Sequence, residues 1–399
     1  MLLSIALVLI FGWLFGELFG KLRLPKLMGM IAAGIALNCL GLLDSVFLSI
    51  SGDLRKIALV IILLRAGISI KPAELKRIGR PAALMCFVPA CFEMAGTVLL
   101  APLLLGLSYT EAAVLGAVLG AVSPAVIVPK MIRFIEEGHG TNKLIPQLIL
   151  AGASMDDVFV IVMFSVFAGL EQSGGVSAGA VINVPVSIIS GAAAGALAGL
   201  LLAFVFKKIH IRDSAKVIIL MGTALFLTAA EGLVGGYFGF SVTVAVIAAG
   251  IFFGQRATVP AARVAQKLNK LWLCAEIMLF VLVGAAVDLN AAVSAGAGTL
   301  LLLAGALVFR AAGVLVCLIG TKLCAKERLF CVFAYIPKAT VQAAIGGMPL
   351  AMGMACGQTV LSAAVIAILI TAPVGAFLIE LFGKRWLAVE PKSDAVTKL

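Results

Sequence analysis

Charged side chains are scarce in this 399-residue sequence, and the shortage decides its class. Only 12% of the residues are Asp, Glu, Lys or Arg, whereas a soluble globular protein has about 25%. Hydrophobic residues make up 63% of the chain, and the mean hydropathy is +1.19. Such a chain has too few polar side chains to cover its surface in water, so the composition indicates an integral membrane protein.

Histidine and metal-type cysteine motifs are also lacking. The sequence has two histidines, His139 and His210, and no two of its eight cysteines have CxxC spacing. A zinc site would therefore have too few ligands, and we interpret the cysteines, most of them in or at the ends of apolar runs, as small buried hydrophobic residues. We expect no cofactor, no disulfide framework and no enzymatic activity.

Apolar runs are what the sequence has in abundance. Runs bounded by charge, glycine or proline predict about 13 membrane-spanning helices. No Lys or Arg precedes the first run, so we interpret it as a helix and not as a signal peptide. The predicted spans are 2–20, 27–43, 56–70, 81–106, 111–129, 144–170, 177–206, 217–234, 241–254, 271–287, 298–321, 329–352 and 359–383.

The basic residues test this segmentation. The odd-numbered connections and the C-terminal tail hold 25 of the 30 Lys and Arg residues, and the even-numbered connections hold only Arg55 and Lys56. The positive-inside rule then places the N-terminus outside and the C-terminus in the cytoplasm of an inner or plasma membrane. The net charge of +11 is thus a topology signal and does not require a nucleic-acid partner. His139 and His210 fall in cytoplasmic connections, where pH sensing and simple solvation both remain open.

A few charged residues fall inside the predicted spans. An ionised group at the bilayer centre costs at least about 2.5–3.5 kcal/mol, so each one indicates a functional site or a partner. Asp156 and Asp157 are adjacent in an otherwise uncharged run, "AGASMDDVFVIV" (151–162). Their mutual repulsion and their burial both disfavour full ionisation, so one acid is suited to trade a proton for a small cation. The other charges of this kind are Arg65, Glu93, Glu231, Glu276, Arg310 and Lys338.

Two stretches predict broken helices. "GAVLGAVSPAVIVPK" (116–130) contains Pro124 and Pro129, and "YIPKATVQAAIGGMP" (335–349) contains Pro337. Proline removes a backbone donor and disrupts the preceding turn. Unwound backbone inside a membrane occurs where protein buries it or where it lines a cavity, and there its carbonyl groups can bind ions.

The two breaks belong to a repeat. Spans 4–6 and spans 11–13 each consist of a helix with a buried charge, a broken helix and a third helix, and they cross the membrane in opposite directions. Glu93 and Arg310 occupy matching positions, which predicts an ion pair between them. Lys338 lies where the second broken helix resumes, and its charge could offset the helix dipoles at a crossing of the breaks. Inverted repeats with matching breaks are typical of secondary transporters.

These motifs resemble the sodium/proton antiporter fold of the monovalent cation/proton antiporter superfamily, in particular its NHA branch (sodium/hydrogen exchanger-like domain proteins). The similarity extends from the third to the twelfth span. Its pieces are "LLRAGISIKPAELKR" (63–77), "LGAVSPAVIVPKMI" (119–132), "LAGASMDDVFVIVMF" (150–164), "LFVLVGAAVDL" (279–289) and "IPKATVQAAIGGMPLA" (336–351).

The resemblance implies an all-α polytopic homodimer with two crossed broken helices, in which a moving core works against a dimerisation scaffold. Asp157 would be the main carrier of cation or proton, with Asp156 beside it. The remaining implied ion ligands are Ser123, Ser154 and Thr340, and Glu93 would pair with Arg310. The implied parts are scaffold 1–80, core repeat 81–172, linking helix 173–206, scaffold 207–290, core repeat 291–383 and cytoplasmic tail 384–399.

One departure from the resemblance concerns Arg310. Electrogenic bacterial relatives have lysine at this position, in contact with the acidic pair. Arginine is effectively never deprotonated in proteins, so Arg310 cannot be a second proton carrier. The number of protons per cation therefore stays open.

We predict alternating-access exchange of sodium or lithium for protons. Potassium/proton exchange on the same scaffold and sodium-coupled symport of an organic anion remain alternatives. An intramembrane aspartyl protease is disfavoured, because it needs aspartates on two helices and commonly a GxGD motif. A channel is disfavoured because inverted repeats have no evident purpose in a passive pore.

Overall fold

The computed structural model of the chain describes residues 1–22, 24–69, 79–173, 178–209, 211–234, 239–288 and 296–389. These residues are almost entirely helical, with one isolated antiparallel bridge between His139 and Val389. His210 and most of the predicted tail lie outside the described residues. The elements are α1 (Leu2–Lys21), α2 (Lys26–Cys39), α3 (Ser45–Ser49), α4 (Ser51–Ser69), α6 (Arg80–Met85), α7 (Val88–Leu105), α8 (Tyr109–Leu119), α9 (Pro124–Glu137), a 3₁₀ turn (Thr141–Lys143), α10 (Ile145–Gln172), α11 (Ala178–Lys208), α12 (Asp213–Val234), α13 (Val242–Arg256), α14 (Thr258–Ala285), α16 (Gly296–Cys317), α17 (Ala325–Ala334), α18 (Thr340–Ile345), α19 (Met348–Ala351) and α20 (Gly357–Trp386).

Each predicted span coincides with a helix or a broken pair of helices. Within the described ranges, nine helical stretches are long and apolar enough to cross a membrane, and α2 and α13 are shorter apolar helices. The largest boundary error is at α14, which begins at Thr258 and not near residue 271. Its first half carries lysines and an arginine, yet Ala261, Val264 and Leu268 recur at helical spacing and are buried. An amphipathic stretch of this kind forms a helix although its mean hydropathy is low.

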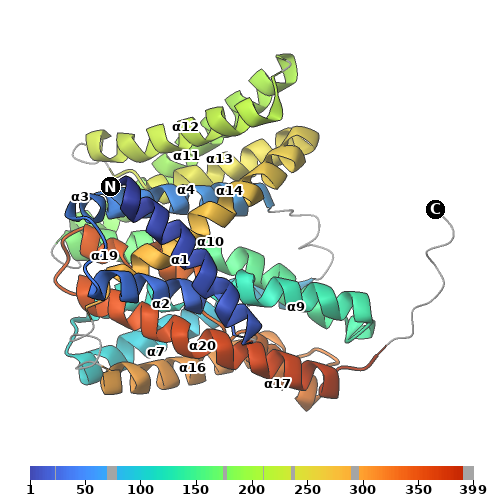
Figure 1. The fold of residues 1–399 in the computed structure, drawn as a ribbon. Coiled ribbons are helices and arrows are strands. Elements are labelled where there is room, and N and C mark those ends of the chain that lie inside the picture. Colours follow the sequence, from blue (N-terminus) through green and yellow to red (C-terminus); the bar gives the residue numbers. More distant parts are fainter. Residues whose placement is uncertain are drawn as a thin grey trace.

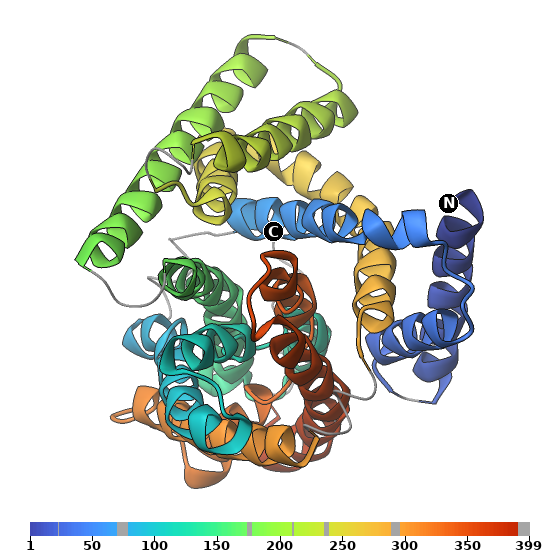
Figure 2. The same cartoon turned by 90° about the vertical axis from the view of Figure 1, so that its left-hand side faces the viewer.

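The helices form two groups (Figures 1 and 2). In one group, which we call the scaffold, α1, α2, α4, α11, α12, α13 and α14 pack against one another. In the other, which we call the core, α7 packs along α16, and α10 and α20 pack against both broken helices. The two groups meet where α4, α13 and α14 contact α10, α18 and α20.

Small residues allow the scaffold helices to approach very closely. Gly191, Gly195 and Gly199 recur every four residues and so lie along one face of α11. A methyl group at each would come within 2.0–2.4 Å of a backbone carbonyl oxygen of α13 or of the residue that caps its N-terminus. The three carbonyl oxygens belong to Ser241, Ala245 and Ala249. Close backbone packing of this type replaces the hydrophobic effect, which cannot drive helix association in lipid.

The two predicted breaks are present and meet inside the core. The first separates α8 from α9, and the second separates α17 from α18. The Ser123 backbone N–H donates to the Pro337 carbonyl oxygen at 2.8 Å, so the breaks are joined by a main-chain hydrogen bond. Pro124 is the first residue of α9, where its missing N–H costs nothing. The prediction of a break at Pro129 is wrong: the residue lies inside α9, which continues to Glu137.

Candidate functional site

The two adjacent acids lie midway along α10, between the crossing of the breaks and the scaffold. The buried residues Ile149, Ala153 and Val160 fix this helix in the core. Consecutive helical residues point about 100° apart, so Asp156 and Asp157 face different neighbours. Asp156 has no exposed surface and Asp157 is 7% exposed.

Asp156 faces the first break and the helix α16. Its Oδ2 accepts a hydrogen bond from the Val122 backbone N–H at 2.8 Å and an ion-pair contact from Arg310 Nη2 at 3.0 Å. Its Oδ1 is buried and has no hydrogen-bond partner in the part of the chain that the structure describes. Asp156 is therefore a neutralised acid with one free oxygen atom.

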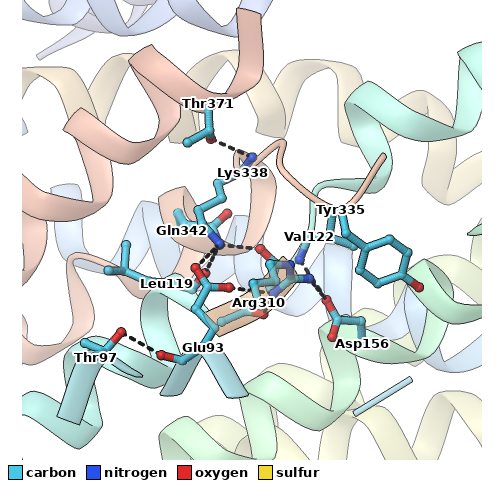
Figure 3. A network of polar contacts seen from close by, with 12 residues as sticks. Glu93, Thr97, Leu119, Val122, Asp156, Arg310, Tyr335, Lys338, Gln342 and Thr371 are labelled. Atoms are coloured by element: carbon cyan, nitrogen blue, oxygen red, sulfur yellow. Dashed lines mark hydrogen bonds and ion pairs between the residues drawn. The ribbon is translucent and has the colours of Figure 1, made fainter. Parts of the chain in front are cut away.

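Glu93 links two cations from the other half of the chain (Figure 3). Arg310 Nη1 lies 2.6 Å from Glu93 Oε2, and Lys338 Nζ lies 2.6 Å from Glu93 Oε1. All three side chains are buried. The ion pair predicted between Glu93 and Arg310 is present, and Lys338 joins it from within the second break.

The same cations cap the C-terminal end of α8. The last carbonyl groups of a helix have no partner within it, and the helix dipole makes that end negative. Lys338 Nζ donates to the Leu119 carbonyl oxygen at 2.5 Å, and Arg310 Nη1 donates to that of Gly120. Gln342 Nε2 donates to the Ala121 carbonyl oxygen at 2.9 Å. The unwound end of α8 is thus stabilised by side chains from α16, the second break and α18.

Counting charges separates the two acids of α10. Glu93, Asp156, Arg310 and Lys338 form a connected quartet with no net charge. Asp157 stands outside it. Asp157 has no hydrogen bond or ion pair with any described residue, and its Oδ1 is buried without a partner. Arg65 of α4 acts on it only through space, and the same guanidinium lies over the Trp272 ring at 5.8 Å from the centroid.

The other predicted ligands lie near the crossing. Ser123 is fully buried, and its hydroxyl group has no partner within the described ranges. Thr340 is the buried first residue of α18. The side chains of Ser154 and Glu231 lie outside the described residues. Sequence reasoning missed Gln342 and Thr371; the Thr371 hydroxyl oxygen accepts the Lys338 backbone N–H at 2.9 Å. Gln342 could have been found, because it is the polar residue of the "PKATVQA" motif.

A cavity of about 760 Å³ lies between the scaffold and the core. Leu59 of α4 and Thr243 of α13 line its scaffold side, and Phe164 and Ser165 of α10 line its core side. Phe164 follows Asp157 by seven residues on α10, which corresponds to about 10 Å along the helix axis. The cavity therefore ends roughly two turns from the unpaired acid.

Comparison with known proteins matches this architecture. The profile of the family described as "Sodium/hydrogen exchanger, transmembrane" matches residues 5–384. The chain is 33% identical to sodium/hydrogen exchanger 9B2 of Mus musculus over 93% of this chain and 71% of that protein. It is 31% identical to sodium/hydrogen exchanger 9B1 of Homo sapiens, over 91% of this chain and 73% of that protein. The solved structure of the sodium proton antiporter MjNhaP1 from Methanocaldococcus jannaschii superposes with a TM-score of 0.79 at 22% identity, covering 96% of this chain and 97% of that one.

Proposed function

Because this chain belongs to the sodium/hydrogen exchanger family, we propose that it exchanges sodium or lithium for protons across a membrane, with Asp157 as the carrier. It is a multi-pass membrane protein of the antiporter fold. The transported ions are substrates, and the mechanism needs no cofactor.

The observation that carries this proposal is the single uncompensated acid beside a neutral quartet. An ionised carboxylate without a partner in a low-dielectric interior is costly, and either a proton or a small cation removes that cost. Both ligands neutralise the same group, so they compete for it. Competition at one acid couples proton movement to cation movement.

Three oxygen atoms without protein partners support a cation site at this acid. Asp156 Oδ1, Asp157 Oδ1 and the Ser123 hydroxyl oxygen are all buried, and none has a hydrogen-bond partner among the described residues. Carboxylate and hydroxyl oxygens are hard ligands, which suits small cations. Ser154 and Thr340 complete the proposed ligand set, with Asp156 supplying an oxygen atom while Arg310 holds its other one.

The two-part architecture supports alternating access. The core would move against the scaffold and expose Asp157 to each side of the membrane in turn. In the orientation given by the positive-inside rule, with the N-terminus outside and the C-terminus in the cytoplasm of an inner or plasma membrane, the 760 Å³ cavity faces outward. We further propose that two copies associate through their scaffolds.

Proteoliposome flux tests the proposal. Wild-type protein should release trapped protons when sodium or lithium is added outside, and potassium should have little effect. Asp157→Asn removes the titratable group and should abolish this flux. Asp53→Asn changes an exposed aspartate on α4 and is the matched control. Normal cation-dependent flux in Asp157→Asn would overturn the assignment, and a preference for potassium would change the substrate.

A further inference from the structure

Tyr335 is a fully buried aromatic residue that touches the ion-pair quartet without belonging to it. It follows the last residue of α17 and immediately precedes the second break. It belongs to a buried apolar cluster with residues from α6, α9, α10, α16, α17 and α20. It therefore contacts elements of both inverted repeats.

The two ends of the Tyr335 side chain have different neighbours. Its ring lies against Arg310, with the guanidinium Cζ 5.4 Å from the ring centroid. Its hydroxyl group points away from the ion pairs (Figure 3) and donates to the Met85 carbonyl oxygen at 3.3 Å. Ring and hydroxyl together fix the position of the side chain between α6 and α16.

Gly152 of α10 provides the space for this hydroxyl group. A Cβ atom at Gly152 would lie 2.0 Å from the Tyr335 hydroxyl oxygen and 2.9 Å from Met85 Cβ. Gly152 precedes Asp156 by four residues, so both lie on the same face of α10. The same tyrosine thus sets the approach of the Asp156 helix and the position of the arginine that pairs with Asp156.

Arg310 depends on this support because its hydrogen bonds leave part of the guanidinium free. Nη1 and Nη2 contact Glu93, Gly120 and Asp156, whereas Nε is buried and has no hydrogen-bond partner among the residues that the structure describes. The aromatic face of Tyr335 is the cation–π partner of the guanidinium. Removing the ring would leave a space into which the guanidinium can rotate away from Asp156.

We propose that Tyr335 is a positioning residue that holds Arg310 on Asp156 Oδ2, so that the other carboxylate oxygen atom, Oδ1, keeps its place at the cation site. This inference rests on the proposed antiport function. It assigns part of the geometry of the ion site to an aromatic residue that does not touch the ions.

Sodium affinity at one fixed pH tests the inference. Tyr335→Leu removes the ring, so the sodium concentration for half-maximal exchange should rise at least about tenfold while the maximal rate changes little, because a ligand position and not the moving core is disturbed. Tyr335→Phe keeps the ring and should retain the wild-type value. A wild-type value in Tyr335→Leu, or a similar rise in Tyr335→Phe, would overturn the proposal.

Melting temperatures of single and double variants test the contact between Tyr335 and Gly152 independently of transport. In purified protein, Gly152→Ala should lower the melting temperature, and the decrease should be smaller when Tyr335→Phe has removed the hydroxyl oxygen. Gly169→Ala, on the same helix but with no atom within 4 Å of the new methyl group, should lower it little or not at all. An equal decrease for Gly152→Ala in both backgrounds would show that Tyr335 does not occupy this space. If wild-type protein lacks cation-dependent flux, the antiport proposal fails while this cycle still decides the contact.

Discussion

At the level of single side chains, the two adjacent acids of α10 differ in their partners. Asp156 contacts Arg310 and the Val122 backbone N–H, whereas Asp157 contacts neither. Removing one member of a buried ion pair leaves an uncompensated charge, which costs about 3–5 kcal/mol. Removing an acid that has no partner leaves no such charge.

The first prediction is therefore an asymmetry in stability. Asp156→Asn should lower the free energy of unfolding by about 3 kcal/mol, because Arg310 loses a partner. Asp157→Asn should leave it unchanged or raise it. Melting temperatures of the purified variants at neutral pH measure both effects, and equal losses would contradict the assignment of Asp156 to the quartet.

The second prediction concerns Glu93, which neutralises two cations. Glu93→Gln should cost about 3–5 kcal/mol, because Arg310 and Lys338 then share only one acid. Adding Lys338→Gln restores the balance of charge, so the double variant should melt above Glu93→Gln alone. Additive losses in the double variant would show that Lys338 and Glu93 do not interact.

At the level of helices, the sequence predicted where the helices break better than where each helix begins and ends. Pro124 and Pro337 lie at or within breaks, but Pro129 is accommodated inside α9 because a helix can continue past a single missing N–H when its other residues pack. The early start of α14 was missed because its buried residues are interleaved with lysines, and hydropathy averages the two faces. Tyr335 was missed because no local pattern marks the space that Gly152, distant in sequence, provides for it.

The third prediction tests the contact between α11 and α13. Gly195→Val would place its side chain against the Ala245 carbonyl oxygen, and overpacking of this kind costs about 1–3 kcal/mol. Gly222→Val on α12 meets no atom within 4 Å of its Cβ position and is the control with the same substitution. A lower melting temperature for the first variant only is the expected result, and similar values for both would argue against close backbone packing.

At the level of the whole molecule, composition and apolar runs predicted a multi-pass membrane protein, because both follow from the solvent and not from specific contacts. The orientation derived from the basic residues stays a prediction. The antiporter architecture was predicted through the order of its motifs. The neutral quartet could be predicted only in part: the sequence predicted the pairing of Glu93 with Arg310, but the contacts of Lys338 with Glu93 and of Arg310 with Asp156 depend on how the breaks cross.

The fourth prediction uses the cavity between scaffold and core. In a background without native cysteines, Ser165→Cys should react with a bulky, membrane-impermeant thiol reagent added outside, and its exchange should fall by at least about tenfold because the filled cavity blocks domain movement. Asp53→Cys, at an exposed position near the start of α4, is the control that reacts with the same reagent away from the cavity. Complete modification of Ser165→Cys with normal flux would contradict movement across this boundary.

The hydrogen bond between the Ser123 N–H and the Pro337 carbonyl oxygen has a consequence for genetics. Both of its atoms belong to the main chain, so almost every amino-acid exchange at either position preserves the donor and the acceptor. Proline at position 123 is the one encoded residue that lacks the N–H. Side-chain substitutions at these positions therefore report on the Ser123 hydroxyl group or the Pro337 ring and not on this bond, and an amide-to-ester replacement between residues 122 and 123 would be needed to reveal its contribution.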